Sequence, residues 1–236
     1  LVGRGSDSIE EVEGVELSGG EGDNLLDATM ATVAVTLNGG AGDDTLSGGS
    51  NDDVLMGLDG DDVFDGGEGL DLVQASGDVD WTLTDSSLRG EGSDLLISIE
   101  KARLTGGNTA NVLDATGFSG SAWLIGGDGA DTLRGGSGDD VLVGGAGHDA
   151  IAGRAGNDRI NGSSGNDLVI GQAGDDTVLG GAGADSILGG AGDDLIKGQA
   201  GNDRLCGGIG DDTVVGSEAE IDECFGDCFA DFCPEI

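Results

Sequence analysis

The 236-residue sequence predicts an all-β fold built from short, repeated strands. Fourteen nine-residue units share one pattern of glycines, one aspartate and one apolar residue, and each unit has room for one short strand. The composition includes 51 Gly, one Pro and only 3% aromatic residues. Such a chain cannot fill the thick core of an ordinary domain of this length. Each repeat is therefore expected to bury only a thin layer of side chains.

The nine-residue units form two uninterrupted runs. Four units occupy residues 39–74 and ten units occupy residues 126–215. Position one is Gly in every unit, position two is Gly in nine units, and position four is Gly in all units except one, where Asn51 stands. Because Gly and, next to it, Asn tolerate a left-handed backbone, we expect tight turns over positions one to four.

Positions six and eight carry the remaining pattern. Position eight is always apolar and is expected to point inward, whereas positions seven and nine also accept polar residues. Position six is always Asp, and turning glycines would bring backbone carbonyl oxygens toward its carboxylate. Calcium takes six to eight oxygen ligands in tolerant geometry, whereas magnesium demands a stricter octahedron, so calcium is the better match. The candidate metal ligands are Asp44, Asp53, Asp62, Asp71, Asp131, Asp140, Asp149, Asp158, Asp167, Asp176, Asp185, Asp194, Asp203 and Asp212.

The pattern G-G-x-G-x-D-x-U-x, with U apolar, resembles the RTX, or haemolysin-type calcium-binding, repeat family. The resemblance implies a right-handed parallel β-roll, a solenoid in which two nonapeptides make one turn. It also implies calcium ions between Asp-bearing loops one turn apart, so that Asp158 shares ions with Asp140 and Asp176. On this rule the long run would hold about eight ions and the short run about two, roughly ten in all.

A Gly- and Asp-rich composition is also typical of disordered, solvated linkers. We expect disorder without calcium, because stacked carboxylates repel one another and a thin core cannot compensate. With calcium we expect the ordered roll, since the inward apolar residue keeps its phase in every unit. The expected affinity is that of extracellular calcium modules, about 10⁻⁴ to 10⁻³ M per site.

The segments outside the two runs contain a second, longer repeat. Shifting the sequence by 87 residues aligns residues 3–38 with residues 90–125 without a gap, and 14 of these 36 positions are identical. We therefore expect residues 1–38 and 75–125 to be two copies of irregular solenoid coils. The chain begins partway through a copy, which favours further coils upstream in a precursor.

Two features of these coils carry specific expectations. Asp27 and Asp114, in the shared string "LDAT", could bind an ion or stabilise a turn, and the turn role is favoured. The string "DVDWTLTDSSL" alternates apolar and polar residues. It predicts a half-buried strand with Trp81 and Leu83 on one face.

Residues 216–236 differ in composition and are expected to cap the roll. Their apolar spacing predicts a short amphipathic helix or a compact turn. The helical spacing is that of Ile221, Cys224, Phe225, Cys228, Phe229 and Phe232. Cys206, at outward position nine of its unit, makes an even set of four with Cys224, Cys228 and Cys233. Two disulfides in an oxidising compartment are favoured, with three possible connectivities; a zinc site is the alternative, although no C-x-x-C pair is present.

The net charge and the absence of known catalytic motifs argue against several classes of function. The net charge of -38 argues against nucleic acid or an anionic membrane as partner and favours cations. The single histidine, His148, sits at variable position five, where a surface role is expected, and neither G-x-S-x-G nor H-E-x-x-H occurs. We therefore expect no enzyme activity.

Two functions fit these expectations. One is a secreted or cell-surface structural or adhesive protein, stiffened by calcium in an extracellular matrix or filament. The alternative is the C-terminal calcium-binding module of a larger secreted enzyme or toxin, which folds outside the cell. The two ends of the roll could also meet head to tail and form filaments, or the tail could pack only on its own last turn.

Overall fold

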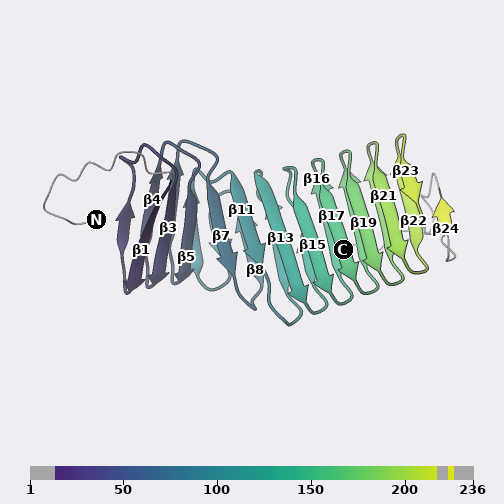
Figure 1. The fold of residues 1–236 in the computed structure, drawn as a ribbon, viewed down its shortest axis with the longest axis horizontal. Helices are drawn as coiled ribbons and strands as arrows, with labels where there is room; N and C mark the ends of the chain where they lie inside the picture. Colours follow the sequence, from purple (N-terminus) through teal and green to yellow (C-terminus); the bar gives the residue numbers. More distant parts are fainter. Residues whose placement is uncertain (1–13, 217–222, 226–236) are drawn as a thin grey trace, which may run out of the picture.

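The computed structural model describes residues 14–216 and 223–225, and these residues form only strands, turns and loops. The strands build two hydrogen-bonded sheets, one of 11 strands and one of 13. Figure 1 shows them crossing the long axis of an elongated molecule, with the first strand of the chain near one end and the last strand near the other. The predicted all-β solenoid is confirmed. In the described ranges, no helix is long and apolar enough to cross a membrane.

Except within residues 81–97, consecutive strands along the chain belong to opposite sheets. The 11-stranded sheet contains, in spatial order, β1 (Val15–Glu21), β3 (Val35–Ala41), β5 (Val54–Asp59), β7 (Leu72–Ser76), β11 (Lys101–Thr105), β13 (Ser121–Asp128), β15 (Val141–Ala146), β17 (Arg159–Ser164), β19 (Thr177–Ala182), β21 (Leu195–Ala200) and β23 (Thr213–Val215). The 13-stranded sheet contains β2 (Leu25–Asp27), β4 (Thr45–Gly49), β6 (Val63–Gly67), β10 (Ser93–Ile97), β9 (Ser87–Arg89), β8 (Trp81–Thr84), β12 (Val112–Gly117), β14 (Thr132–Arg134), β16 (Ala150–Ala155), β18 (Leu168–Ala173), β20 (Ser186–Ala191), β22 (Arg204–Ile209) and β24 (Glu223–Phe225).

The register is that of a parallel roll with two repeats per turn. In the long run, β15 pairs in parallel with β17 and places Val141 opposite Arg159, eighteen residues later. The next pair in the same sheet continues the register, with Arg159 opposite Thr177. Side chains alternate between the two faces of a strand, so identical repeat positions stack in columns.

The core is a single column of side chains from each sheet. Position-eight residues of the two runs are buried except Val214, which is partly buried, and Leu142, Val169 and Ile187 have no exposed surface. The irregular coils continue the same column through Leu104 and Leu113, as expected for coils of one solenoid. Positions seven and nine lie mostly at intermediate exposure on the outer faces.

Between the two runs, the 13-stranded sheet departs from the roll pattern. The strands β8, β9 and β10 form an antiparallel meander, with β9 paired to both neighbours. The outer two strands of the meander join the parallel sheet, β10 to β6 and β8 to β12. One turn of the roll thus contributes three strands to this sheet and one to the other. Trp81 and Leu83 are buried on one face of β8, as predicted, but the sequence did not reveal the meander.

The predicted C-terminal helix does not include residues 223–225. These form β24, which pairs in parallel with Arg204–Cys206 of β22 and so adds a strand to the stack. Cys206 is buried although it occupies outward position nine. Residues 217–222 and 226–236 lie outside the described residues. The expected disulfides, the alternative zinc site and the cap itself therefore stay predictions.

Candidate metal sites along the two edges of the roll

The loops between strands use left-handed backbone at positions two and four. Position two has positive φ in twelve of the fourteen units, even where Gly is replaced. Its five non-Gly residues are Leu58, Arg154, Ser163, Gln172 and Gln199, with φ between 73° and 84°. Because side chains make this conformation unfavourable, the stacked loops must impose it.

Two loops depart from this conformation, at residues 48–53 and 135–140. Neither has positive φ at position two or four, so the expectation of a left-handed Asn51 was wrong. The two loops lie 87 residues apart and belong to corresponding places in the duplicated sequence. Each is the first loop on its edge after an irregular coil, and its stacking partner is not a regular repeat. The glycine pattern alone therefore does not decide the loop conformation, since residues 135–140 keep Gly at positions one, two and four.

All fourteen predicted aspartates stand where a loop enters a strand. Thirteen are at most 2% exposed, and Asp212 has intermediate exposure. One carboxylate oxygen of each accepts a backbone hydrogen bond from one turn earlier. For example, Asp158 Oδ1 accepts from Asp140 N at 2.8 Å, and Asp176 Oδ1 accepts from Asp158 N at 2.8 Å. The position-six carboxylates thus form an inner ladder along each edge, with the pairs that the resemblance implied.

The second carboxylate oxygen of most members has no protein partner. Among the described residues, ten of these Oδ2 atoms are buried and accept no hydrogen bond: those of Asp44, Asp62, Asp71, Asp131, Asp149, Asp158, Asp167, Asp176, Asp185 and Asp194. Burying an ionised carboxylate oxygen without a partner is costly, so this arrangement calls for a cation. Asp53 and Asp140 differ, because their Oδ2 atoms accept hydrogen bonds of 2.7 Å from Gly49 N and Gly136 N.

Backbone carbonyl oxygens converge on the same places. A Cβ atom added to Gly144 would collide with Asp149 Oδ2 and with the carbonyl oxygen of Gly162, which lies one turn later. The same pair of oxygens crowds position one of the other inner units of the long run. Position one is therefore Gly because carboxylate and carbonyl oxygens of two consecutive turns approach its Cα. A hard cation that prefers oxygen ligands fits this set of donors.

The side chains alone would not hold an ion. Within the described ranges, no cluster brings together three or more His, Cys, Asp or Glu side chains. Beside position one of the inner units of the long run, a carboxylate oxygen lies near a backbone carbonyl oxygen of the next turn. Calcium accepts this mixture of ligands readily, whereas magnesium would demand a stricter geometry.

Burial makes several inner-ladder carboxylates difficult to ionise. It raises the pKa of Asp158 to about 8, assisted by the charges of Asp140 and Asp176, although a backbone hydrogen bond opposes the shift. Burial also raises the pKa of Asp149 and Asp185 to about 6. In the absence of metal, binding of protons or of another positive charge would therefore stabilise the inner ladder.

Comparison with known protein families agrees with this geometry. The RTX calcium-binding nonapeptide repeat (4 copies) matches residues 38–73, 47–81, 116–151, 144–178, 152–187 and 179–214, together more than half of the chain. The chain belongs to the RTX repeat family. No curated protein matches the chain significantly. The RTX repeats imply that the ions are calcium.

The inner ladders extend beyond the RTX repeats through residues that the sequence did not reveal. Asp62 N donates to Asp94 Oδ1 at 3.0 Å on one edge, and Asp71 N donates to Glu100 Oε2 at 3.1 Å on the other. Burial raises the pKa of Asp94 to about 6. The sequence does contain a signal for these two residues. Under the 87-residue shift, Asp94 and Glu100 align with identical residues of the first copy.

The two "LDAT" aspartates stabilise turns, as favoured from the sequence. Asp27 Oδ1 accepts hydrogen bonds from the backbone N and the hydroxyl of Thr29, at 3.0 and 2.7 Å. Asp114 Oδ1 accepts from Thr116 N at 2.9 Å, and its Oδ2 forms an ion pair of 3.5 Å with Arg134. Both side chains are thus engaged by local partners.

Position five of the RTX repeat forms an outer ladder, which the sequence did not reveal. Its exposed side chains accept backbone hydrogen bonds from position five of the next turn. Asp175 Oδ1 accepts from Asp193 N at 2.9 Å, and Asn166 Oδ1 accepts from Ala184 N at 2.8 Å. His148 lies on the surface, as expected, and its Nδ1 accepts from Asn166 N at 2.7 Å. Position five therefore contributes to the stacking of turns.

Replacing Asn166 with Ala is expected to lower the free energy of unfolding of the calcium-bound roll by about 0.5 to 1 kcal/mol, because Ala184 N loses its acceptor. Asn166→Asp keeps an acceptor oxygen at the same place and serves as the control. Thermal unfolding in excess calcium measures both variants. Equal transition temperatures for Asn166→Ala and the wild type would contradict a stabilising role of the outer ladder.

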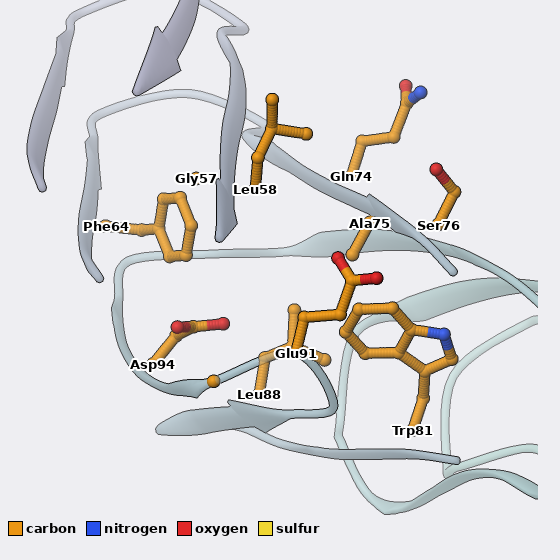
Figure 2. A pocket seen from close by; sticks show the side chains of 11 residues that line it. Gly57, Leu58, Phe64, Gln74, Ala75, Ser76, Trp81, Leu88, Glu91 and Asp94 are labelled. Carbon is orange, nitrogen blue, oxygen red and sulfur yellow. The ribbon is translucent and has the colours of Figure 1, made fainter. Parts of the chain in front are cut away.

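A small cavity lies beside the meander. Figure 2 shows Phe64, Trp81, Leu88, Glu91 and Asp94 among the residues that line it. Its volume is about 10 Å³, close to the space of one water molecule. The cavity is therefore too small for an organic substrate.

Proposed function

We propose that this chain is a secreted calcium-binding structural protein in which calcium folds and stiffens the roll outside the cell, at a cell surface or in an extracellular matrix. The observation that carries the proposal is the inner ladder, with ten buried carboxylate oxygens that accept no hydrogen bond among the described residues. The RTX family match supports calcium as the ion and the secreted class of protein.

Calcium would supply positive charge and bridge oxygen atoms of consecutive turns. The chain would hold it with the position-six carboxylates and the position-one carbonyl oxygens, as at Asp149 and Gly162. Because each ion would be shared by two turns, binding at one turn would favour order in the next. The expected product is a stiff rod with the elongated shape seen in Figure 1.

A structural role is favoured over a catalytic one because the carboxylates occupy equivalent positions in one repeat. Catalytic acid–base pairs need two groups in different environments, with pKa values pushed apart. The alternative, a folding module of a larger secreted enzyme or toxin, uses the same roll and differs only in what is attached. Filament formation and disulfide bonding stay predictions, because they depend on residues 217–236, of which the structure describes only 223–225.

Asp176→Asn is expected to weaken the binding of the two calcium ions that Asp176 would share with Asp158 and Asp194. The variant removes the charge of a buried carboxylate whose Oδ2 accepts no hydrogen bond from the described residues. Asp175→Asn removes the same charge from the adjacent, exposed side chain and keeps an oxygen acceptor for Asp193 N. Isothermal titration with calcium is the measurement, and Asp175→Asn should bind like the wild type.

Equal losses in Asp176→Asn and Asp175→Asn would mean that overall charge, and not the inner ladder, attracts calcium. Wild-type behaviour of both variants would also contradict the proposed sites. A wild-type chain that binds no calcium at millimolar concentration would remove the proposed function altogether.

A further inference from the structure

Asp71 is the last position-six aspartate of the first RTX run, yet it keeps every feature of an inner-ladder residue. Its side chain has no exposed surface, and its Oδ2 accepts no hydrogen bond among the described residues. Its Oδ1 accepts from Asp53 N at 2.8 Å, as in a regular unit. No nonapeptide follows it, and the RTX family matches leave residues 82–115 uncovered. Something outside the repeats must therefore complete its surroundings.

The segment Ser98–Glu100 takes the place of the missing repeat. A Cβ atom added to Gly66 would collide with Asp71 Oδ2 and with the carbonyl oxygen of Ser98. This reproduces the arrangement at Gly144, with Ser98 in the role of the position-one Gly one turn later. Asp71 N donates to Glu100 Oε2 at 3.1 Å, so Glu100 stands where the next position-six Asp would stand.

Ser98 and Glu100 replace the position-one Gly and the position-six Asp in a loop that is shorter than that of a nonapeptide. In a nonapeptide, five residue steps separate position one from position six, whereas only two steps separate Ser98 from Glu100. Ser98 has a φ of 52°, in the left-handed region, which lets the chain turn sharply between β10 and β11. Glu is one methylene longer than Asp, so its carboxylate can reach inward from this short connection.

We propose that Asp71, Glu100 and the carbonyl oxygen of Ser98 hold a calcium ion at the junction between the first RTX run and the meander. This site rests on the proposed function, because it uses the same chemistry as the inner ladder. Its ligands come from one repeat and one non-repeat segment. It would connect the short run to the second irregular coil and so keep the roll ordered across the gap in the repeats.

The duplicated sequence is consistent with a required carboxylate. Glu13, which aligns with Glu100, is the same residue, although residues 8–12 share no identity with residues 95–99. An acidic side chain is thus retained at the end of a segment whose other residues have changed.

Bound calcium per chain, measured by equilibrium dialysis and metal analysis of the full chain in excess calcium, tests the site. Glu100→Gln keeps an acceptor for Asp71 N but removes the charge, and it is expected to bind one ion fewer than the wild type. Glu100→Asp keeps the charge but shortens the side chain, and it should lose the same ion. Glu68→Gln makes the matched change at an exposed residue of the Gly66–Asp71 loop and should bind as many ions as the wild type.

Wild-type stoichiometry in Glu100→Gln, with fewer ions in Asp176→Asn, would overturn this site and leave the proposed function intact. Equal losses in Glu68→Gln and Glu100→Gln would also overturn it, because general charge would then explain the effect. Circular dichroism in excess calcium accompanies each variant. Loss of several ions together with β-structure would assign Glu100 to folding rather than to one ion, and would overturn the proposal as well.

Discussion

In excess chelator at neutral pH, the chain is expected to lose most of its β-structure and to regain it when calcium reaches millimolar concentration. Far-ultraviolet circular dichroism, recorded with chelator and after adding calcium back, measures the change. The effect should be large because the inner ladders run along both edges of the roll and stack buried carboxylates turn upon turn.

The size of the calcium-binding free energy favours an all-or-none dependence of folding on calcium. At a free calcium concentration ten times the dissociation constant, each site adds about 1.4 kcal/mol to the stability of the folded state. About ten sites would add on the order of 14 kcal/mol, which is comparable with the whole net stability of 5–15 kcal/mol of an ordinary domain. A core of one side-chain column per sheet cannot replace that contribution.

Magnesium at the same concentration provides the control for the calcium experiment. It is expected to restore little β-structure, because mixed carboxylate and carbonyl ligands on a repeating backbone do not offer the octahedron that magnesium requires. A β-rich spectrum that persists in excess chelator would contradict calcium-dependent folding. Equal recovery with magnesium would contradict the assignment of the ion.

The geometry of the repeat could be predicted because the same residue types recur at the same positions in fourteen units. Because position eight is always apolar and position six is always Asp, only one assignment fits: the position-eight side chain enters the core and the position-six side chain enters the loop. Leu142 and Asp140 illustrate this, because both are buried and lie only two residues apart. The inner ladder pairs followed from the resemblance rather than from the residues alone.

The departures from the repeat could not be predicted, because they depend on neighbours in the stack. The strand β9 has only three residues, and its antiparallel pairing is visible only once β8 and β10 are in place. The loop around Asn51 lacks the left-handed backbone of most other loops, although its unit keeps Gly at positions one and two. Glu100 enters the inner ladder through a connection with no glycine signal. Position five holds Asp, Asn or His in eleven units, all able to accept the same backbone hydrogen bond, and Leu or Ala in the other three, so no single residue type reveals the outer ladder.

Without calcium, lowering the pH from about 8 to about 5 is expected to increase the β-structure of the chain. The inner-ladder carboxylates are the cause. Burial raises the pKa of Asp176 and Asp194 to about 6 and that of Asp158 to about 8, from an ordinary value of 3.8. Folded aspartates with raised pKa values bind protons more tightly than the same residues in the unfolded chain. Protonation therefore stabilises the folded roll.

The sign of these shifts defines the pH window. The stabilisation is complete below the ordinary pKa of 3.8 and is lost as the pH rises through about 6 for Asp176 and about 8 for Asp158. Protons and calcium then compete for the same oxygens. Calcium should be required for folding at pH 8, and its apparent affinity should fall as the pH drops below about 6.

Circular dichroism of the metal-free chain across this range, with light scattering to detect aggregation, measures the effect. Asp158→Asn removes the group with the highest pKa and should raise the β-content of the metal-free chain at pH 8, because an amide has no charge to bury. Glu68→Gln removes an exposed charge and should follow the wild type. A metal-free chain that stays unfolded at pH 5, or an Asp158→Asn variant less ordered than Glu68→Gln at pH 8, would show that carboxylate repulsion is not what keeps the roll unfolded.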